Sequence, residues 1–142
     1  MTSEHIVSSF DSDLAELNHM VARLGGLAEQ QFAAAVEALE TRNTDNIDAI
    51  VEADEALDKL EYELNERAIE VIARRSPMAK DLRRIIVALR VAGNLERIGD
   101  YAKNIAKRSR VIIEHEKILG DNISIARIAG LTQQMINQVL DA

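Results

Sequence analysis

Apolar residues recur every three or four positions through most of the chain, which is the spacing that places them on one face of an α-helix. The first stripe comprises Leu14, Leu17, Val21, Leu24, Ala28, Phe32, Ala35 and Leu39. The second comprises Ile47, Ile50, Leu57, Leu64, Ala68 and Val71. The third comprises Leu82, Ile85, Leu89, Ala92, Ile105 and Ala106, and a shorter fourth comprises Ile128, Leu131, Met135 and Val139. The pattern predicts three long helices followed by a shorter one.

Polar and proline residues suggest where these helices begin and end. Thr44 is a candidate N-cap of the second helix, because its hydroxyl can accept a free N–H of the first turn. Ser76 and Pro77 read as the N-cap and first residue of the third helix, which should run to about Glu116. Gly120 is a natural residue to end it. Long helices joined by short connections predict an all-α fold, an antiparallel three-helix bundle with a fourth helix.

Composition supports this fold and excludes several kinds of chemistry. Hydrophobic residues make up 47% of the 142 residues but aromatics only 3%, so the core must be aliphatic. One proline and six glycines are too few for a β-sandwich or barrel. The absence of cysteine excludes disulfides, thiolate nucleophiles and Cys-based metal sites. No apolar run is long enough to span a bilayer and the N-terminus does not resemble a signal peptide, so we expect a cytoplasmic protein.

Charge is distributed very unevenly along the chain. Residues 1–70 hold seventeen acidic and four basic residues, whereas residues 74–110 hold eleven basic and three acidic ones. One interpretation is that the two stretches lie on neighbouring helices and offset each other. The other is that the basic stretch docks on an acidic partner or membrane surface. The net charge of −7 disfavours nucleic acid as a partner.

The fourth helix repeats part of the first. A shift of 104 positions aligns residues 22–30 with residues 126–134, and five of the nine pairs are identical. Gly26 matches Gly130, and a glycine inside a helix is costly unless a neighbouring backbone comes close. The alternative is chance similarity between two amphipathic helices. The repeat divides the chain into a three-helix unit, residues 1–120, and the first helix of a second unit, residues 121–142, whose remainder is absent. The unpartnered apolar stripe of that helix predicts self-association, with helix exchange as one route.

Acidic residues interrupt two of the apolar stripes. Asp54 and Glu61 occupy core positions of the second helix, and Asp58 follows Asp54 by one turn. Glu96 breaks the third stripe in the same way, with Asp100 one turn later. An antiparallel hairpin with its turn near residue 76 places residue 54 opposite about residue 97. Four carboxylates should therefore converge, with small residues at Gly93 and Gly99 making room, and such a group is typical of a hard-cation or multinuclear metal site.

A second interpretation leaves these acids without a metal. Arg90, Arg97 or Lys59 could neutralise them by salt bridges, because an ionised carboxylate on a core stripe needs some cation or hydrogen-bond network. Glu29 and Gln30 of the first helix fall at a similar height and are weaker additional candidates. A ferritin-like di-iron site is disfavoured, since neither acid pair continues into Glu-x-x-His.

Several segments together resemble the PhoU family of phosphate-signalling proteins. The segment Asn94–Asp100 reads Asn-Leu-Glu-Arg-Ile-Gly-Asp and, with Asn104 following, is similar to that family's Glu/Asp-x-x-x-Asp signature. The segments Gly25–Gln31, Ala73–Pro77 and Asp81–Arg83 also resemble its first repeat. The similarity covers essentially the whole chain.

The resemblance implies a site and an organisation. Family members typically have two three-helix repeats, each with a pair of acidic motifs that can bind iron or zinc clusters. Asp54 and Asp58 match the first motif of a pair, and Glu96 and Asp100 match the second. The chain departs from the pattern in length, because the metal motifs of a second repeat are not in it.

The resemblance also implies a function. The protein would be a cytoplasmic negative regulator of phosphate uptake and phosphate-starvation signalling. Separately, the apolar stripe of the fourth helix predicts a homo-oligomer such as a homodimer. The protein would bridge the ATPase subunit of a phosphate ABC transporter and a sensor histidine kinase, contacting the membrane only through these partners. We expect no enzymatic activity, since the sequence shows no arrangement for nucleophilic catalysis and no glycine-rich phosphate loop. The alternatives are a carboxylate-bridged metalloenzyme and a purely structural helical adaptor without metal.

Overall fold

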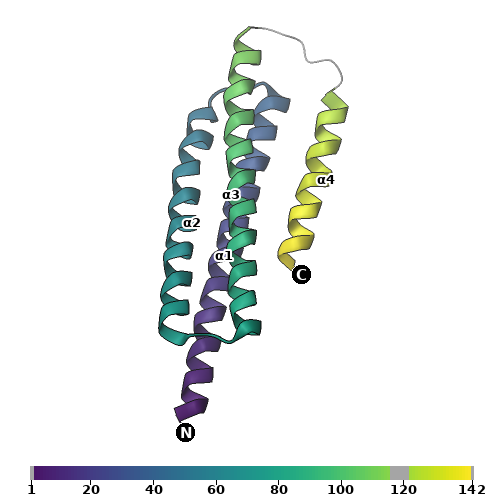
Figure 1. Cartoon of the computed structure of the whole chain (residues 1–142). Coiled ribbons are helices and arrows are strands. Elements are labelled where there is room, and N and C mark those ends of the chain that lie inside the picture. Colours follow the sequence, from purple (N-terminus) through teal and green to yellow (C-terminus); the bar gives the residue numbers. More distant parts are fainter. Residues whose placement is uncertain (1, 116–121, 142) are drawn as a thin grey trace.

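The computed structural model describes residues 2–115 and 122–141, with side chains described for residues 8–115 and 127–141. These residues form four helices, α1 (Thr2–Thr41), α2 (Ile47–Arg75), α3 (Ala79–Glu114) and α4 (Asn122–Asp141). The first three run up, down and up as an elongated antiparallel bundle, and α4 runs back down beside α1 (Figure 1). The predicted all-α, antiparallel three-helix bundle with a fourth helix is confirmed.

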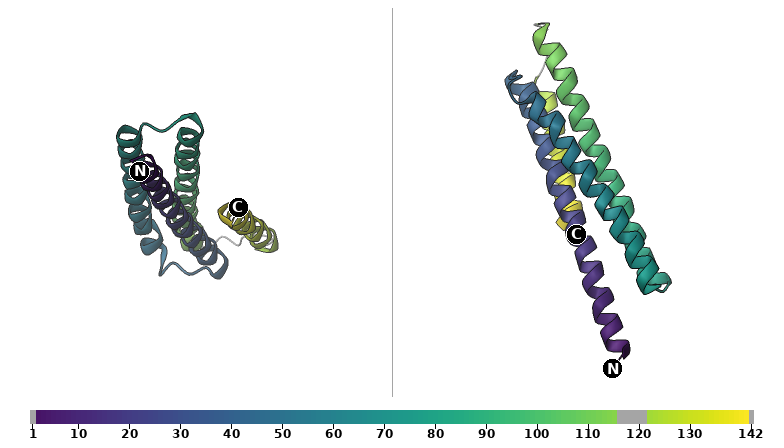
Figure 2. Two further views of the ribbon diagram at one scale, coloured as in Figure 1. Left: turned by 90° about the horizontal axis from the view of Figure 1, so that it is seen from below. Right: turned by 90° about the vertical axis from the view of Figure 1, so that its left-hand side faces the viewer.

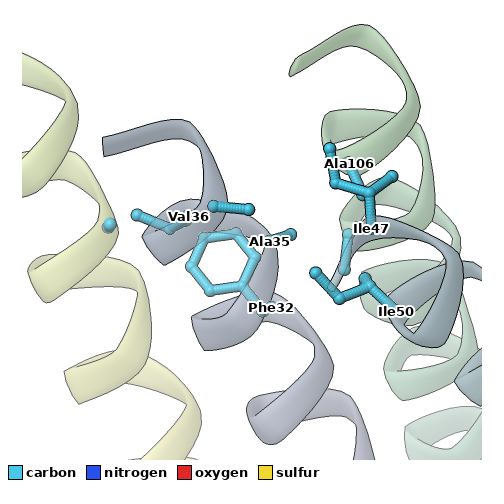
Figure 3. Close-up of a cluster of buried hydrophobic side chains, with 9 residues drawn as sticks. Phe32, Ala35, Val36, Ile47, Ile50 and Ala106 are labelled. Atoms are coloured by element: carbon cyan, nitrogen blue, oxygen red, sulfur yellow. The ribbon is translucent and has the colours of Figure 1, made fainter. Parts of the chain in front are cut away.

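The core of the bundle is aliphatic, as the composition predicts. It forms three clusters stacked along the bundle axis, and the fully buried large side chains include Leu17, Leu24, Ile47, Leu57 and Ile85. Figure 3 shows the cluster near the α1–α2 turn, to which α1, α2, α3 and α4 all contribute apolar side chains. Each buried Leu or Ile stabilises the fold by about 1.5–3 kcal/mol relative to an exposed one. No helix in the described part of the chain has the length and apolar character needed to cross a membrane.

The second helix begins later than Thr44 predicts. Its first residue is Ile47, preceded by Asn46, whose side chain makes no capping hydrogen bond. Thr44 contributes its backbone carbonyl, which accepts a hydrogen bond of 3.2 Å from the Ile47 N–H. The Asn43 side chain accepts a bond of 2.9 Å from the Asp45 N–H, and this local turn occupies the residues that the capping prediction assigned to the helix start. The prediction of Thr44 as an N-cap is therefore wrong.

The assignment of Ser76 and Pro77 to the third helix is also wrong. Ser76 adopts a left-handed conformation (φ 44°, ψ 58°), and its N–H donates to the Ile72 carbonyl at 3.0 Å, so it ends α2. Proline disfavours right-handed helical geometry in the residue before it, which prevents α2 from running on into α3. Met78 is extended and α3 starts at Ala79. At the other end α3 stops at Glu114, and Gly120 lies outside the described residues.

The expected close approach at the repeated glycines is not observed. A Cβ added at Gly26 or Gly130 would meet nothing within 4 Å, so no contact explains why these positions match. The neighbouring Gly25 is the crowded position, because a Cβ there would lie 2.5 Å from the Leu140 side chain. Gly25 thus allows α4 to pack on α1, which is the helix that α4 contacts most closely in the described structure.

The acidic and basic stretches face each other across the bundle. Arg75 pairs with Asp13 at 3.0 Å and Lys103 pairs with Asp54 at 2.9 Å. Arg110 at the end of α3 reaches an α2 carboxylate as well. These pairs support the interpretation that the acidic and basic stretches lie on neighbouring helices and offset each other's charge. The exposed pair of Arg110 with Asp48 contributes about 0–1 kcal/mol. Asp13 and Asp54 are buried, so their pairs also compensate the cost of removing a carboxylate from water.

Candidate metal centre

Facing turns of α2 and α3 bring the predicted acids together. One carboxylate oxygen each of Asp54, Asp58 and Asp100 lies within 4.8 Å of the other two. Glu96 lies one turn before Asp100 on α3, close enough to Asp100 and Asp58 that both raise its pKa. Three of the four predicted acids, Asp54, Asp58 and Asp100, therefore meet at one level, and Glu96 lies beside them. Their role as metal ligands stays a prediction.

The depth of the cluster follows from the heptad position of each acid. Asp54 occupies a core position of α2, and its side chain is only 5% exposed. Asp58 is exposed, and Glu96 and Asp100 are partly exposed along the neighbouring edge of α3. The cluster therefore has a buried base at Asp54 and opens to solvent.

Gly99 sets the spacing of the helices at this level. A Cβ at Gly99 would lie 2.8 Å from Leu57 Cδ1 and 2.9 Å from Gln31 Oε1, so both neighbours pack directly over the α3 backbone. Gly93 differs, because an added Cβ there would meet nothing within 4 Å. The prediction that small residues make room is correct for Gly99 and wrong for Gly93.

Lys103 provides the positive charge of the site. Its ammonium group lies 2.9 Å from Asp54 Oδ2 and 3.9 Å from Asp100 Oδ1. A lysine beside several carboxylates supplies three N–H donors and one unit of charge to a group that would otherwise repel itself. The Asp54 carboxylate in turn raises the pKa of Lys103.

The cations predicted to neutralise the acids are not the ones that do so. Arg90, Arg97 and Lys59 are all exposed and form no ion pair among the described residues. Lys103 follows Asp100 by three positions, so it lies on the same helical face one turn further along. The prediction did not include Lys103, whose side chain reaches from α3 to Asp54 on α2.

Burial and mutual repulsion shift the protonation of the acids. Burial together with the hydrogen bond and charge of Asp100 raises the pKa of Glu96 to about 7, with Asp58 adding to the effect. Burial, Asp54 and Asp100 likewise raise the pKa of Asp58. Two carboxylates this close repel each other when both are ionised, so one of them keeps its proton to a higher pH than an isolated carboxyl group does. That proton reduces the negative charge of the cluster, as a further cation would.

Two buried oxygen atoms at this level have no hydrogen-bond partner in the described structure, Asp54 Oδ1 and Gln31 Oε1. Gln31 donates from Nε2 to the Ile50 carbonyl at 3.2 Å, one turn before Asp54. Buried polar atoms without partners are rare, and a carboxylate oxygen in that position is suited to bind a cation. The three-carboxylate spacing and the unpaired Asp54 oxygen fit a metal ion that prefers oxygen ligands.

Sequence reasoning missed Gln31 and named its neighbours instead. Glu29 lies against α4, where the Asn137 amide nitrogen, in its donating orientation, is 3.0 Å from both carboxylate oxygens, and Gln30 is exposed. Glu29 and Gln30 are therefore not part of the acid cluster. The signal for Gln31 was available, since it lies seven residues after Leu24 on the apolar stripe, where a polar residue must be buried.

Comparison with known proteins identifies relatives across the whole chain. Residues 21–109 match the family model of the PhoU domain, a range that contains all four acids. A phosphate-specific transport system accessory protein PhoU homolog from Caulobacter vibrioides is 41% identical over 99% of this chain and 61% of its own length. Its counterpart from Zymomonas mobilis is 38% identical over 97% and 58%, and PhoU of Escherichia coli is 31% identical over 99% and 58%. The chain thus spans about three fifths of the curated relatives it matches. The predicted division at residue 120 stays a prediction.

The raised pKa of Glu96 predicts that stability falls as the pH rises. The folded protein retains the Glu96 proton up to about pH 7, whereas the unfolded chain releases it near 4.5, so the stabilisation is complete below 4.5 and lost as the pH rises through 7. Because Glu96 is partly exposed, we expect the metal-free protein to lose about 1–2 kcal/mol of unfolding free energy between about pH 5 and 8 relative to Glu96→Gln. Urea unfolding at a series of pH values measures this, with Glu66→Gln on the exposed face of α2 as the control. Parallel pH profiles for wild type and Glu96→Gln would contradict it.

Proposed function

The chain belongs to the PhoU domain family, and on this premise we propose that it is an accessory regulator of phosphate transport. The observation that carries the proposal is the family match over residues 21–109, which coincides with the three-helix bundle and the acid cluster. The curated relatives are named as accessory proteins of the phosphate-specific transport system. A regulatory role, rather than a catalytic one, agrees with those names.

In finer detail, we propose a cytoplasmic adaptor that represses phosphate uptake and phosphate-starvation signalling. It would join the ATPase subunit of a phosphate ABC transporter to a sensor histidine kinase, favouring the phosphatase state of the kinase when phosphate is plentiful. The outer face of α3 offers a surface for such docking. Arg83, Arg90 and Arg97 recur there at seven-residue intervals, all exposed, on the same face of the helix. A row of unshielded guanidinium groups favours an acidic protein surface.

Co-purification of the full chain with the transporter ATPase subunit and with the kinase tests this role. We expect capture of both partners, and a loss of capture of tenfold or more in Arg90→Glu/Arg97→Glu, about the effect of placing like charges at an interface. Arg23→Glu/Arg42→Glu changes the net charge equally at exposed positions outside α3 and serves as the control. Failure to capture either partner at both high and low phosphate would remove the adaptor role. Capture that is insensitive to the α3 variant would remove only the α3 surface.

We also propose that Asp54, Asp58, Glu96 and Asp100 bind iron or zinc, as one ion or a small cluster. The support is the convergence of carboxylates and the unpaired, buried Asp54 oxygen. A bound cation would neutralise the cluster and link α2 to α3. Lys103 occupies part of the same space, since its ammonium group contacts Asp54. Metal binding would therefore require that the Lys103 ammonium leave Asp54 and that Glu96 lose its proton.

Metal analysis of purified variants tests the site. We expect bound metal in wild type and little in Glu96→Gln/Asp100→Asn, with Glu63→Gln/Glu66→Gln on the exposed face of α2 as the matched control. Lys103→Met should bind metal about tenfold more tightly, because a hydrogen bond between charged groups is worth about 1.5–3 kcal/mol and no longer competes. Equal and negligible metal in wild type and the double acid variant would refute the site. Unchanged affinity in Lys103→Met would refute only the competition.

A further inference from the structure

The outer surface of the bundle carries three exposed apolar side chains on the adjacent helices α2 and α3. Tyr62 and Ile69 of α2 are 65% and 59% exposed, and Ile86 of α3 is 37% exposed. Because α2 and α3 are antiparallel and joined near residue 77, Ile69 lies level with Ile86. Single exposed apolar residues are common on proteins, but apolar side chains grouped on two adjacent helices indicate a contact surface.

The acid cluster fixes how these side chains lie relative to one another. Asp58 and Asp100 meet across α2 and α3. Tyr62 follows Asp58 by one turn along the same edge of α2. Ile86 and Gly93 precede Asp100 by fourteen and seven residues, so they follow the facing edge of α3. The apolar surface is therefore continuous with the acid cluster, and we call it the α2–α3 face, which comprises Tyr62, Ile69, Ile86 and Gly93.

Gly93 leaves open space in the α2–α3 face. The register that packs Leu57 against Gly99 places Tyr62 level with Gly93. A Cβ at Gly93 would meet nothing within 4 Å, so no contact in the described structure accounts for the glycine, although glycine inside a helix is less favourable than alanine. A position without a side chain allows another molecule to approach the backbone closely. Gly93 is therefore suited to accept a large side chain from a partner.

The α2–α3 face lies away from α4. The left view of Figure 2 shows α3 between α2 and α4, and α4 makes its close contacts with α1. The cleft between α3 and α4 is lined on α3 by Val91, Leu95 and Ile98. At about 100° per residue, these three lie on nearly the opposite side of α3 from Ile86 and Gly93. A segment that packs beside α4 would therefore be separated from the α2–α3 face by the width of α3.

Charges of opposite sign border the α2–α3 face. The exposed row of Arg83, Arg90 and Arg97 borders it on α3. On the exposed surface of α2 acids outnumber the bases Lys59 and Arg74, and these acids are Glu52, Glu55, Glu63, Glu66 and Glu70. At one end the acid cluster adds negative charge, because its carboxylates outnumber the one ammonium group that contacts them in the described structure. A partner segment that fits must therefore be acidic toward α3 and basic toward α2.

We propose that the α2–α3 face binds an amphipathic α-helix of a partner protein. The helix lies along α2 and α3, with its apolar residues on Tyr62, Ile69 and Ile86 and one large side chain over Gly93. Its acidic flank follows the arginine row of α3, and its basic flank follows α2. Its amino-terminal end lies at the acid cluster, because the partial positive charge of a helix N-terminus is favourable beside carboxylates. The inference rests on the proposed function, since an accessory regulator acts through a protein partner.

Binding of a designed peptide to the full chain tests this face without a natural partner. The probe is a labelled, stapled amphipathic helix of about three heptads, with leucine on one face, glutamate on the flank for α3 and lysine on the other flank. We expect micromolar binding by fluorescence anisotropy and a loss of about tenfold in Ile69→Glu/Ile86→Glu, because the added charges would have to be buried. Both side chains are exposed, so circular dichroism should show an unchanged helix content.

Two further variants make the result specific to the α2–α3 face. Gly93→Leu fills the open space, where an added Cβ meets no atom of the chain within 4 Å, and should also weaken binding by about tenfold. Val87→Glu/Met135→Glu places the same two charges at exposed apolar positions outside the face and should bind the probe as wild type does. No binding of the probe at about 1 mM, or equal binding by wild type and Ile69→Glu/Ile86→Glu, would overturn the proposal.

Charge reversal tests the orientation of the bound helix. Arg83→Glu/Arg90→Glu should weaken binding of the probe that has a glutamate flank and strengthen binding of a second probe in which lysines replace these glutamates. Each change should be about three- to tenfold, which is the effect of two exposed ion pairs. Equal effects of Arg83→Glu/Arg90→Glu on the two probes would overturn the placement of the acidic flank along α3.

The same measurements separate this proposal from the proposed function and from other occupants. If wild type binds the probe but captures neither the transporter ATPase subunit nor the kinase, the adaptor role fails and the helix-binding face stands. If wild type captures a partner but does not bind the probe, the face fails and the adaptor role stands. Competition of the probe by phosphatidylglycerol vesicles, or a dimer of the chain that Ile69→Glu/Ile86→Glu dissociates, would identify a membrane or a second copy as the occupant and would overturn the proposal.

Discussion

The ion pair between Asp54 and Lys103 joins α2 to α3 at the point where burial and charge conflict most strongly. Asp54 lies in a core position, and desolvating a carboxylate is expensive unless a cation or hydrogen bonds compensate. The ammonium group of Lys103 compensates one oxygen at 2.9 Å, whereas the other oxygen has no partner in the described structure. The site is therefore only partly satisfied. Because burial of an incompletely paired charge is destabilising, this arrangement is better explained by a binding function than by stability.

The packing of the surrounding helices holds the carboxylates close together. Leu57 and Gln31 pack directly over Gly99, which holds α1, α2 and α3 close together at the level of the acids. Apolar clusters above and below this level prevent the helices from moving apart to relieve repulsion between the carboxylates. The repulsion appears instead as a raised pKa of Glu96 and of Asp58. Lysine and a bound proton are thus two sources of positive charge for one cluster, and the proposed metal ion would be a third that partly excludes the other two.

Helical periodicity was sufficient to predict most of the architecture. Leu and Ile recurring at core positions predict the helices, and antiparallel pairing then places Asp54 level with Glu96. Features that depend on three-dimensional neighbours were not predictable in this way. Lys103 was missed because the partner of a buried acid depends on side-chain reach across the interface. The position of Gln31 seven residues after Leu24 indicates that it is buried, but its contact with Gly99 depends on how α1 packs on α3, which the pattern does not give. Ser76 was assigned to the wrong helix, since a Ser-Pro pair is compatible with both the end of one helix and the start of the next.

Lys103 occupies the cation position that the proposed metal ion would take over. The most direct test is an anomalous-diffraction map of crystals of the full chain grown with iron or zinc, compared with metal-free crystals. We expect an anomalous peak bounded by Asp54, Asp58 and Asp100 and, in the same crystals, a Lys103 ammonium group that no longer contacts Asp54. A map with no peak among these carboxylates, and with Lys103 still bound to Asp54 at a saturating metal concentration, would contradict it.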